Sequence, residues 1–308
     1  MRDFGRGRLA PSPTGAQHLG NARTYLLAYW AAKASGRELV LRIEDIDSPR
    51  VKPGAAEQAA DDLRWLGIAW QHGPVRQTER RALYDDALRR LIDGDAVYPC
   101  TCTRTDIEGA GSAPHFDHEP AVYPGTCAGW RIGDELPPAG TFAWRFRTDD
   151  RERVFVDAVR GRQSCRLRSD LGDFAITQKT GDAAYQLAVV VDDADMNVDQ
   201  AVRGDDLIAS TFRQMAVAGA LDVASPSFAH VPLVRGPDGR RLAKRHGDTR
   251  LAELRRTGVD PLDVVRWASR SAGFGDDIRH VDDVVPRFSW DPLNRDDVVT
   301  SAGDWGGR

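Results

Sequence analysis

The chain has 308 residues, with 42 basic and 46 acidic side chains and a formal net charge of −4. This length allows two domains, or one domain with insertions. The composition, 41% hydrophobic and 29% charged, is that of an ordinary globular protein, and the net charge argues against indiscriminate binding of nucleic acid. No run of about 18 apolar residues is present, so we expect no membrane segment. The first residues lack the apolar segment of a secretory signal, so we expect a cytoplasmic protein.

The first elements predicted in the chain form a βαβ unit. A short strand at residues 5–11 is followed by a glycine-bearing turn, a helix at 21–36 and a second strand at 37–45. Strand, helix and strand in this order imply two parallel strands. The sequence therefore predicts an α/β fold with a parallel sheet.

Further along the chain, the pattern predicts alternating helices and strands. Helices are expected at 53–67, 80–95 and 206–222, strand-like segments at 141–160 and 229–236, and a buried strand at Leu187–Val191. After residue 248 we expect one or two short helices, and the tail at 294–308 is predicted to be poorly ordered.

The cysteines are too few and too clustered for a disulfide framework. They are Cys100, Cys102, Cys127 and Cys165. From residue 100 to about residue 130 the hydrophobic periodicity fails, which indicates an insertion held together by something other than a core. The first three cysteines offer thiolates for a metal, and a closed structural zinc site needs four ligands. Chemistry alone favours a histidine as the fourth, because phenolate is a rare ligand; the candidates are Tyr123, His115 and His118.

The turn in RLAPSPTGAQHLGNAR, residues 8–23, has features of a phosphate-binding site. A helix N-terminus favours anions, and Gly15 and Gly20 permit close approach of the backbone. His18 and Asn21 can add side-chain donors. A plain strand-to-helix connector explains the turn equally well when it is considered alone.

A second candidate is the lysine in GRRLAKRHG. The chain has 38 arginines and four lysines, yet Lys244 stands between Arg241 and Arg245 after a strong turn signal. A compact ammonium on a flexible stem suits a departing pyrophosphate.

Four ordered strings together resemble the glutamyl branch of the class I aminoacyl-tRNA synthetases. They are RLAPSPTGAQHLGNAR, LRIEDIDSPR, YQLAVVVDDADMNVDQAVRGDDL and HVPLVRGPDGRRLAKR, and the resemblance covers roughly residues 7–255. It implies a Rossmann-like nucleotide-binding catalytic domain that takes ATP with Mg²⁺ as substrate. No cluster identifies the Mg²⁺ ligands. The family motifs differ at Asn21, which replaces a histidine, and at Arg241 and Ala243, which replace lysine and serine.

The resemblance also implies an amino-acid pocket. Arg8 and Arg203 can each bind one carboxylate of L-glutamate, and Glu44 can accept from its ammonium group. Tyr185 and Ser12 supply further hydrogen bonds. The implied reaction forms glutamyl-adenylate, with His18, Gly20, Asn21 and Lys244 binding ATP and the phosphates.

The cysteine pattern is similar to that of the shortened, tRNA-modifying members of this family, the glutamyl-queuosine tRNA(Asp) synthetases. That resemblance implies one structural Zn²⁺ bound by Cys100, Cys102, Tyr123 and Cys127. Only about sixty residues follow Lys244, too few for the helical anticodon-binding region of a full-length relative. We therefore expect activation of glutamate without tRNA, followed by transfer to queuosine in the anticodon loop of tRNA(Asp). The basic segments 145–168 and 235–250 are expected to contact phosphates of this stem-loop.

These expectations divide the chain into four parts. Residues 1–98 form the first half of the catalytic domain, 99–130 the zinc-binding insertion, 131–250 the acceptor-side insertion and second half, and 251–308 a short helical C-terminal segment. A monomer is expected. The alternatives are a compact glutamyl-tRNA synthetase that charges the 3′ end of tRNA(Glu), an inactive zinc-containing RNA-binding paralogue, and a small-molecule nucleotidyltransferase.

Overall fold

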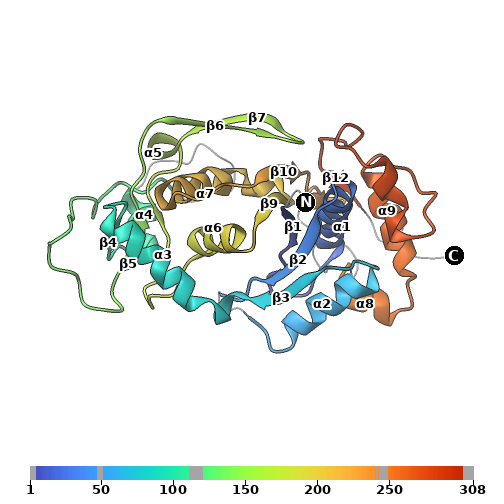
Figure 1. Ribbon diagram of the computed structural model, residues 1–308, viewed down its shortest axis with the longest axis horizontal. Helices are drawn as coiled ribbons and strands as arrows, with labels where there is room; N and C mark the ends of the chain where they lie inside the picture. Colours follow the sequence, from blue (N-terminus) through green and yellow to red (C-terminus); the bar gives the residue numbers. More distant parts are fainter. Residues whose placement is uncertain (1–4, 47–50, 111–120, 241, 243–248, 301–308) are drawn as a thin grey trace.

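The centre of the molecule is a five-stranded parallel sheet with strand order β10-β9-β1-β2-β3 (Figure 1). The computed structural model describes residues 5–46, 51–110, 121–240, 242 and 249–300. The sheet strands are β1 (Arg6–Leu9), β2 (Glu38–Ile43), β3 (His72–Arg76), β9 (Val198–Gly204) and β10 (Ser227–Val231). The predicted parallel α/β sheet is confirmed.

Helix α1 (Leu19–Ala34) is buried on nearly all sides, which its apolar sequence permits. One side packs on β1 and β9, and the other packs on α9 (Pro261–Ser271) and on η5 (Val281–Arg287), a 3-10 helix. The indole Nε1 of Trp30 donates to the carbonyl of Val281 over 2.7 Å. The C-terminal helices therefore cover the helix that follows the first strand (Figure 1).

Three helices pack together on the other side of the sheet: α3 (Arg81–Asp93), α6 (Tyr185–Asp195) and α7 (Ile208–Leu221) (Figure 1). The predicted strand at Leu187–Val191 is wrong, because these residues belong to α6. A continuous apolar run does not distinguish a buried strand from a buried helix. Here the run packs between α3, α7 and the sheet, and the strand follows it as β9.

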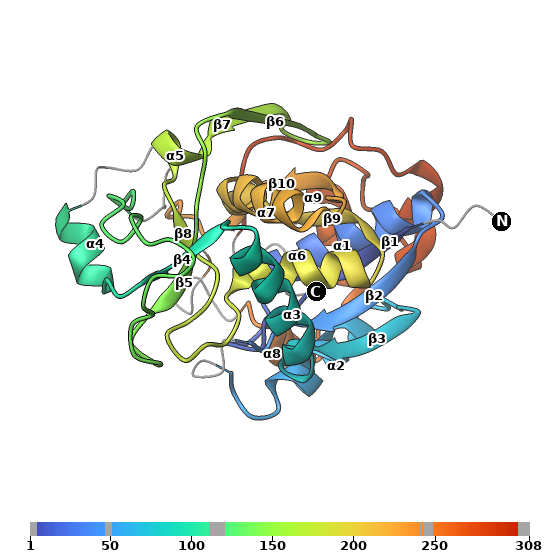
Figure 2. The ribbon, with the colours of Figure 1, turned by 60° about the vertical axis from the view of Figure 1, so that its left-hand side comes forward.

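The insertion between β4 and α6 forms its own small sheets (Figure 2). β4 (Val97–Cys100), β5 (Ala143–Phe146) and β8 (Phe174–Ala175) are antiparallel, and β6 (Glu152–Asp157) pairs with β7 (Gly161–Arg166) as a hairpin. The short helices here are α4 (Arg104–Ala110) and α5 (Leu167–Asp170). The strand-like pattern predicted at 141–160 is confirmed.

The remaining elements lie along the edges. They are α2 (Ala55–Trp65), η2 (Gln77–Glu79), η3 (Asp205–Leu207), β11 (Val234–Arg235), α8 (Leu251–Arg256) and β12 (Val298–Val299). The predicted disorder of the tail is wrong for β12, which pairs in parallel with β11 because the backbone groups of the two segments satisfy each other. Residues 301–308 of that tail lie outside the described residues. Among the described helices, none is long and apolar enough to cross a membrane.

Candidate active site

The C-terminal ends of three neighbouring strands border a cavity of about 390 Å³. Arg8 lies in β1, Glu44 follows β2, and Arg203 lies near the end of β9. Ligands of open α/β sheets bind at this edge. Other lining residues are Ser12, His18, Gly20, Asn21, Tyr25, Tyr185, Asp206 and Leu242. The structure thus brings together every predicted glutamate- and ATP-binding residue except Lys244, which lies outside the described residues, two positions after Leu242 in the sequence.

The first turn of α1 forms one wall of the cavity. His18 is the N-cap: its Nδ1 accepts from the amide of Gly20 over 3.2 Å, while the Oδ1 of Asn21 accepts from the amide of His18 over 3.1 Å. The amide of Leu19 donates to the carbonyl of Thr249 over 3.0 Å. Asn21 therefore completes a reciprocal capping box. The helix amides expected to bind phosphate are already satisfied within the chain, so a phosphate here would contact side chains or displace these caps.

A buried ionic network holds Arg8. Its Nε lies 3.2 Å from Oδ1 of Asp193, which also accepts from Nη1 of Arg42 over 2.6 Å. Nη2 of Arg42 donates to Oε1 of Glu44 over 3.0 Å. Burial opposes the charge of Arg42, but Asp193, Glu44 and Asp192 outweigh it and raise the pKa. Within the described part of the chain, Nε and Nη2 of Arg8 are buried without a hydrogen-bond partner, so Arg8 and Asp193 are joined by charge alone.

Arg203 is held by neutral groups. Its Nε lies 3.2 Å from Nε2 of His230, its Nη2 donates to Oγ1 of Thr211 over 2.7 Å, and its Nη1 lies 3.5 Å from the hydroxyl of Tyr185. Burial and the charge of Arg8 lower the pKa of Arg203, although Tyr185 and the carboxylate of Asp193 act in the opposite direction. No ion pair joins Arg203 to a carboxylate of the described residues within 4.0 Å. A buried cation with no ion pair to any residue that the structure describes, beside a cavity, indicates a site for an anionic ligand.

The residues that orient these arginines were not among those predicted. Asp193 lies in α6, Arg42 in β2 and His230 in β10, and each is buried behind the cavity wall. The sequence carried one signal for Asp193: two adjacent aspartates follow an apolar run. An aspartate that is buried in such a segment requires a cationic partner.

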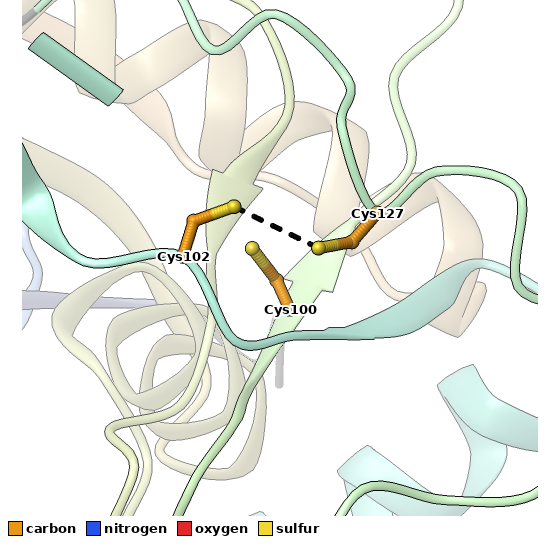
Figure 3. Close-up of side chains that lie close together, drawn as sticks. All are labelled: Cys100, Cys102 and Cys127. Atoms are coloured by element: carbon orange, nitrogen blue, oxygen red, sulfur yellow. Dashed lines mark hydrogen bonds between the residues drawn. The ribbon is translucent and has the colours of Figure 1, made fainter. Parts of the chain in front are cut away.

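Three cysteines converge where β4 meets the following loop. The Sγ atoms of Cys100, Cys102 and Cys127 lie within 4.8 Å of one another and point toward a common centre (Figure 3). The hydroxyl of Tyr123 lies 3.4 Å from Sγ of Cys100 and 3.7 Å from Sγ of Cys102. The predicted clustering of these cysteines is confirmed. Cys165 lies apart in β7, and His115 and His118 are outside the described residues.

The spacing of these donors fits a tetrahedral metal ion. Zn–S bonds of about 2.3 Å imply sulfur–sulfur separations of about 3.8 Å, and the Sγ atoms of Cys102 and Cys127 lie 3.7 Å apart. Burial opposes ionisation of Cys127, but hydrogen bonds from Tyr123 and the backbone lower its pKa to about 7. Thiolate is the ligand form. Burial and the neighbouring Cys100 raise the pKa of Tyr123, so its phenol is neutral in the absence of a cation.

The sheet, the cavity at its C-terminal edge and the inserted cysteine module define a class I synthetase catalytic domain. The family described as tRNA synthetases class I (E and Q), catalytic domain, matches residues 6–278, and the chain belongs to this family of ligases.

Several individual proteins of this family are similar to the chain over nearly its whole length. The chain is 54% identical to a Glutamyl-Q tRNA(Asp) synthetase of Rhodopirellula baltica, with 95% of each chain covered. It is 44% identical to a protein of the same name from Symbiobacterium thermophilum, with 95% of this chain and 94% of the relative covered. A Glutamate--tRNA ligase 2 of Coxiella burnetii is 35% identical over 96% of this chain and 67% of its own length.

A solved structure confirms the fold. The chain superimposes on a glutamate-tRNA synthetase from Elizabethkingia anophelis with a TM-score of 0.83 at 27% identity, covering 98% of this chain and 69% of that one.

Proposed function

We propose that the protein activates L-glutamate with ATP to form glutamyl-adenylate, without needing tRNA for this step. The observation that supports this most directly is the pair of buried arginines, Arg8 and Arg203, beside one cavity. Arg8 has an unpartnered Nη2, and Arg203 lacks a counter-ion among the described residues. Two guanidinium groups match the two carboxylates of glutamate.

Glu44 supplies the complementary negative charge. Its Oε1 accepts from Arg42, so its second oxygen is placed to accept from the ammonium group of the amino acid. Tyr185 and Ser12 complete the pocket as hydrogen-bonding groups. A dicarboxylic amino acid is therefore a better match than its amide, which would leave one arginine without an anionic partner.

In the proposed reaction, the α-carboxylate attacks the α-phosphorus of ATP. A carboxyl–phosphate bond forms, the bond to the β-phosphate oxygen breaks, and pyrophosphate leaves with Mg²⁺. His18 and Asn21 would contact the phosphates and Lys244 would neutralise the leaving group. No side-chain nucleophile is needed, so positioning and charge stabilisation supply the catalysis.

The proposed acceptor is the queuosine base in the anticodon loop of tRNA(Asp). This follows the names of the relatives at 44–54% identity, which match nearly their whole length. Not every arginine of segment 145–168 is available to phosphates: Arg147 donates to backbone carbonyls, and Arg151 and Arg153 bind Asp149. The exposed Arg162 and Arg168 are the better candidates for RNA contacts.

We also propose one structural Zn²⁺ bound by Cys100, Cys102, Tyr123 and Cys127. The near-tetrahedral spacing of the sulfurs and the position of the phenol support it. A bound dication would replace the proton on Tyr123, and it would cross-link a segment with little apolar core.

Two assays test the function. Pyrophosphate exchange into ATP is expected with L-glutamate and no tRNA, and radiolabelled glutamate is expected to attach to tRNA(Asp) only when it bears queuosine. Exchange that requires tRNA(Glu), with label at its 3′ end, would instead identify a compact glutamyl-tRNA synthetase, which the Coxiella burnetii relative favours. Absence of any exchange would indicate an inactive RNA-binding paralogue.

A further inference from the structure

A line of three buried residues runs from the β6–β7 hairpin to the cavity. Asp157 ends β6, His230 lies in β10 and Arg203 lies in β9. Oδ2 of Asp157 lies 2.6 Å from Nδ1 of His230, and Nε2 of the same ring lies 3.2 Å from Nε of Arg203. The carboxylate comes from the insertion, whereas the other two residues come from the central sheet.

The hydrogen bonds of this line determine the tautomer of the imidazole. Nε of Arg203 carries a proton at all pH values of interest, so Nε2 of His230 must accept from it, and the hydroxyl of Thr211, 2.9 Å from the same nitrogen, can donate to it as well. Nδ1 must then carry the proton and donate to Asp157. Burial lowers the pKa of His230, and the charges of Arg203 and Arg8 lower it further, which keeps the ring neutral despite Asp157. The ring is also stacked on Phe228, with centroids 5.9 Å apart.

Asp157 is itself fixed by backbone amides. Its Oδ1 accepts from the amides of Val159 and Arg160 over 2.9 and 2.8 Å, and the amide of His230 lies 3.1 Å from both oxygens. Burial opposes its ionisation, but these bonds and the bond from the His230 ring lower its pKa. The carboxylate is therefore charged and unable to rotate freely.

We propose that Asp157 and His230 are positioning residues for glutamate recognition, which orient Arg203 so that its Nη1 side faces the amino-acid carboxylate beside Tyr185. The inference rests on the proposed function of the cavity. Nε and Nη2 of Arg203 are occupied by His230 and Thr211, whereas Nη1 has only the long 3.5 Å contact with the hydroxyl of Tyr185, so its second N–H is left for the ligand. Neutral acceptors hold the guanidinium without neutralising it, so its charge stays available to the substrate.

An isosteric change at Asp157 tests this directly. In Asp157→Asn the amide oxygen must stay on the amides of Val159 and Arg160, so the NH₂ group turns toward His230. The imidazole must then accept on Nδ1 and carry its proton on Nε2, which opposes the N–H of Arg203 and leaves the oxygen of Thr211 as the acceptor of that proton. The shape of the site is kept while the bond between His230 and Arg203 becomes a repulsion, and the amide of His230 keeps only one of its two acceptor oxygens.

The experiment compares Asp157→Asn with Asp149→Asn, which removes a carboxylate of the same insertion that binds Arg151 and Arg153 instead. Glutamate-dependent pyrophosphate exchange gives KM for glutamate and for ATP, and ¹⁵N NMR of the imidazoles reports the tautomer of His230. We expect Asp157→Asn to raise KM for glutamate about tenfold. KM for ATP stays near the unmodified value, the proton moves to Nε2, and Asp149→Asn resembles the unmodified enzyme.

The outcomes separate this inference from the function on which it rests. An unchanged tautomer, or a changed tautomer with unchanged KM for glutamate, overturns the positioning role and leaves the proposed function intact. Absence of glutamate-dependent exchange in the unmodified enzyme overturns both. If Asp157→Asn does not fold, Thr211→Val removes both the acceptor of Nη2 of Arg203 and the contact with Nε2 of His230, within an isosteric side chain. It is then expected to raise KM for glutamate, and an unchanged KM overturns the inference.

Discussion

Arg8 in β1 and Asp193 in α6 form a buried ion pair, with Nε and Oδ1 3.2 Å apart and both side chains at most 6% exposed. Because the same carboxylate oxygen accepts from Arg42, Asp193 fixes Arg8 relative to the sheet. A helix on one side of the sheet thereby positions a cation at the cavity on its edge.

Asp193→Asn is expected to raise KM for glutamate about tenfold or more. The variant removes the carboxylate that pairs with both Arg8 and Arg42, so one buried positive charge is no longer neutralised. KM for ATP should change little. Exchange kinetics with each substrate varied in turn provide the measurement. Asp195→Asn is the matched control, since Asp195 lies in the same helix but pairs with Arg80 and is 51% exposed. Equal effects of the two variants would contradict the role given to Asp193.

Lys244→Ala is expected to lower the rate of adenylate formation about 100-fold or more, the usual cost of removing one group that stabilises developing charge. KM for glutamate should change less than the rate. Single-turnover formation of glutamyl-adenylate is the measurement. Lys179→Ala is the control, because Lys179 donates to the carbonyl of Thr101 and does not line the cavity. A Lys244→Ala enzyme of normal rate would exclude a role in the chemical step.

Cys102→Ser is expected to abolish stoichiometric zinc, because it replaces one of three thiolates, the strongest ligands of the site, by a hydroxyl that binds Zn²⁺ weakly. Metal analysis of purified protein gives the ratio directly. Cys165→Ala should retain one ion, since Cys165 lies in β7 away from the cluster. Tyr123→Phe distinguishes the fourth ligand: we expect weakened zinc retention in a chelator titration. Loss of zinc in a His115→Ala or His118→Ala variant, with Tyr123→Phe unaffected, would assign a histidine instead.

Asp62→Asn is expected to stabilise the protein above neutral pH. Burial raises the pKa of Asp62 from 3.8 to about 6, with Arg255 3.9 Å away as a distant partner. At pH values between the ordinary pKa and the folded-state pKa, Asp62 binds more protons in the folded state than in the unfolded state. The free energy of unfolding therefore falls as the pH rises through this range. The variant should gain about 1–2 kcal/mol in free energy of unfolding at pH 7.5 and nothing near pH 4.

Urea titrations at both pH values measure this difference. Asp86→Asn serves as the control, because Asp86 is exposed and pairs with Arg89 over 3.0 Å in another helix, α3, and is not among the charges that shift the pKa of Asp62. A gain that is the same at both pH values would show that the titration of Asp62 is not its source.

The sequence was sufficient to predict the features that depend on local pattern. The βαβ unit followed from alternating apolar residues and a glycine-bearing turn, and the spacing of Cys100, Cys102 and Cys127 predicted their convergence. The residues of the cavity wall followed from ordered motifs in which each position has a chemical reason.

The features that could not be predicted depend on tertiary packing. The run Leu187–Val191 is apolar on every face, so only its neighbours α3 and α7 make it helical. His230 and Asp157 are separated by 73 residues, and nothing in either local sequence indicates that they meet. The same holds for Val298 in β12. This strand has only two residues, too few to show the alternating pattern that would predict its pairing with β11.

The pairing of β11 with β12 has a practical consequence for protein engineering. Arg235 binds Asp297, and the amide of Thr300 donates to the carbonyl of Arg235 over 3.0 Å, just before the segment that contains Lys244. A truncation that removes residues 296–300, or an affinity tag that strains them, would take these contacts away from β11. Expression variants for the assays above should therefore keep this stretch intact.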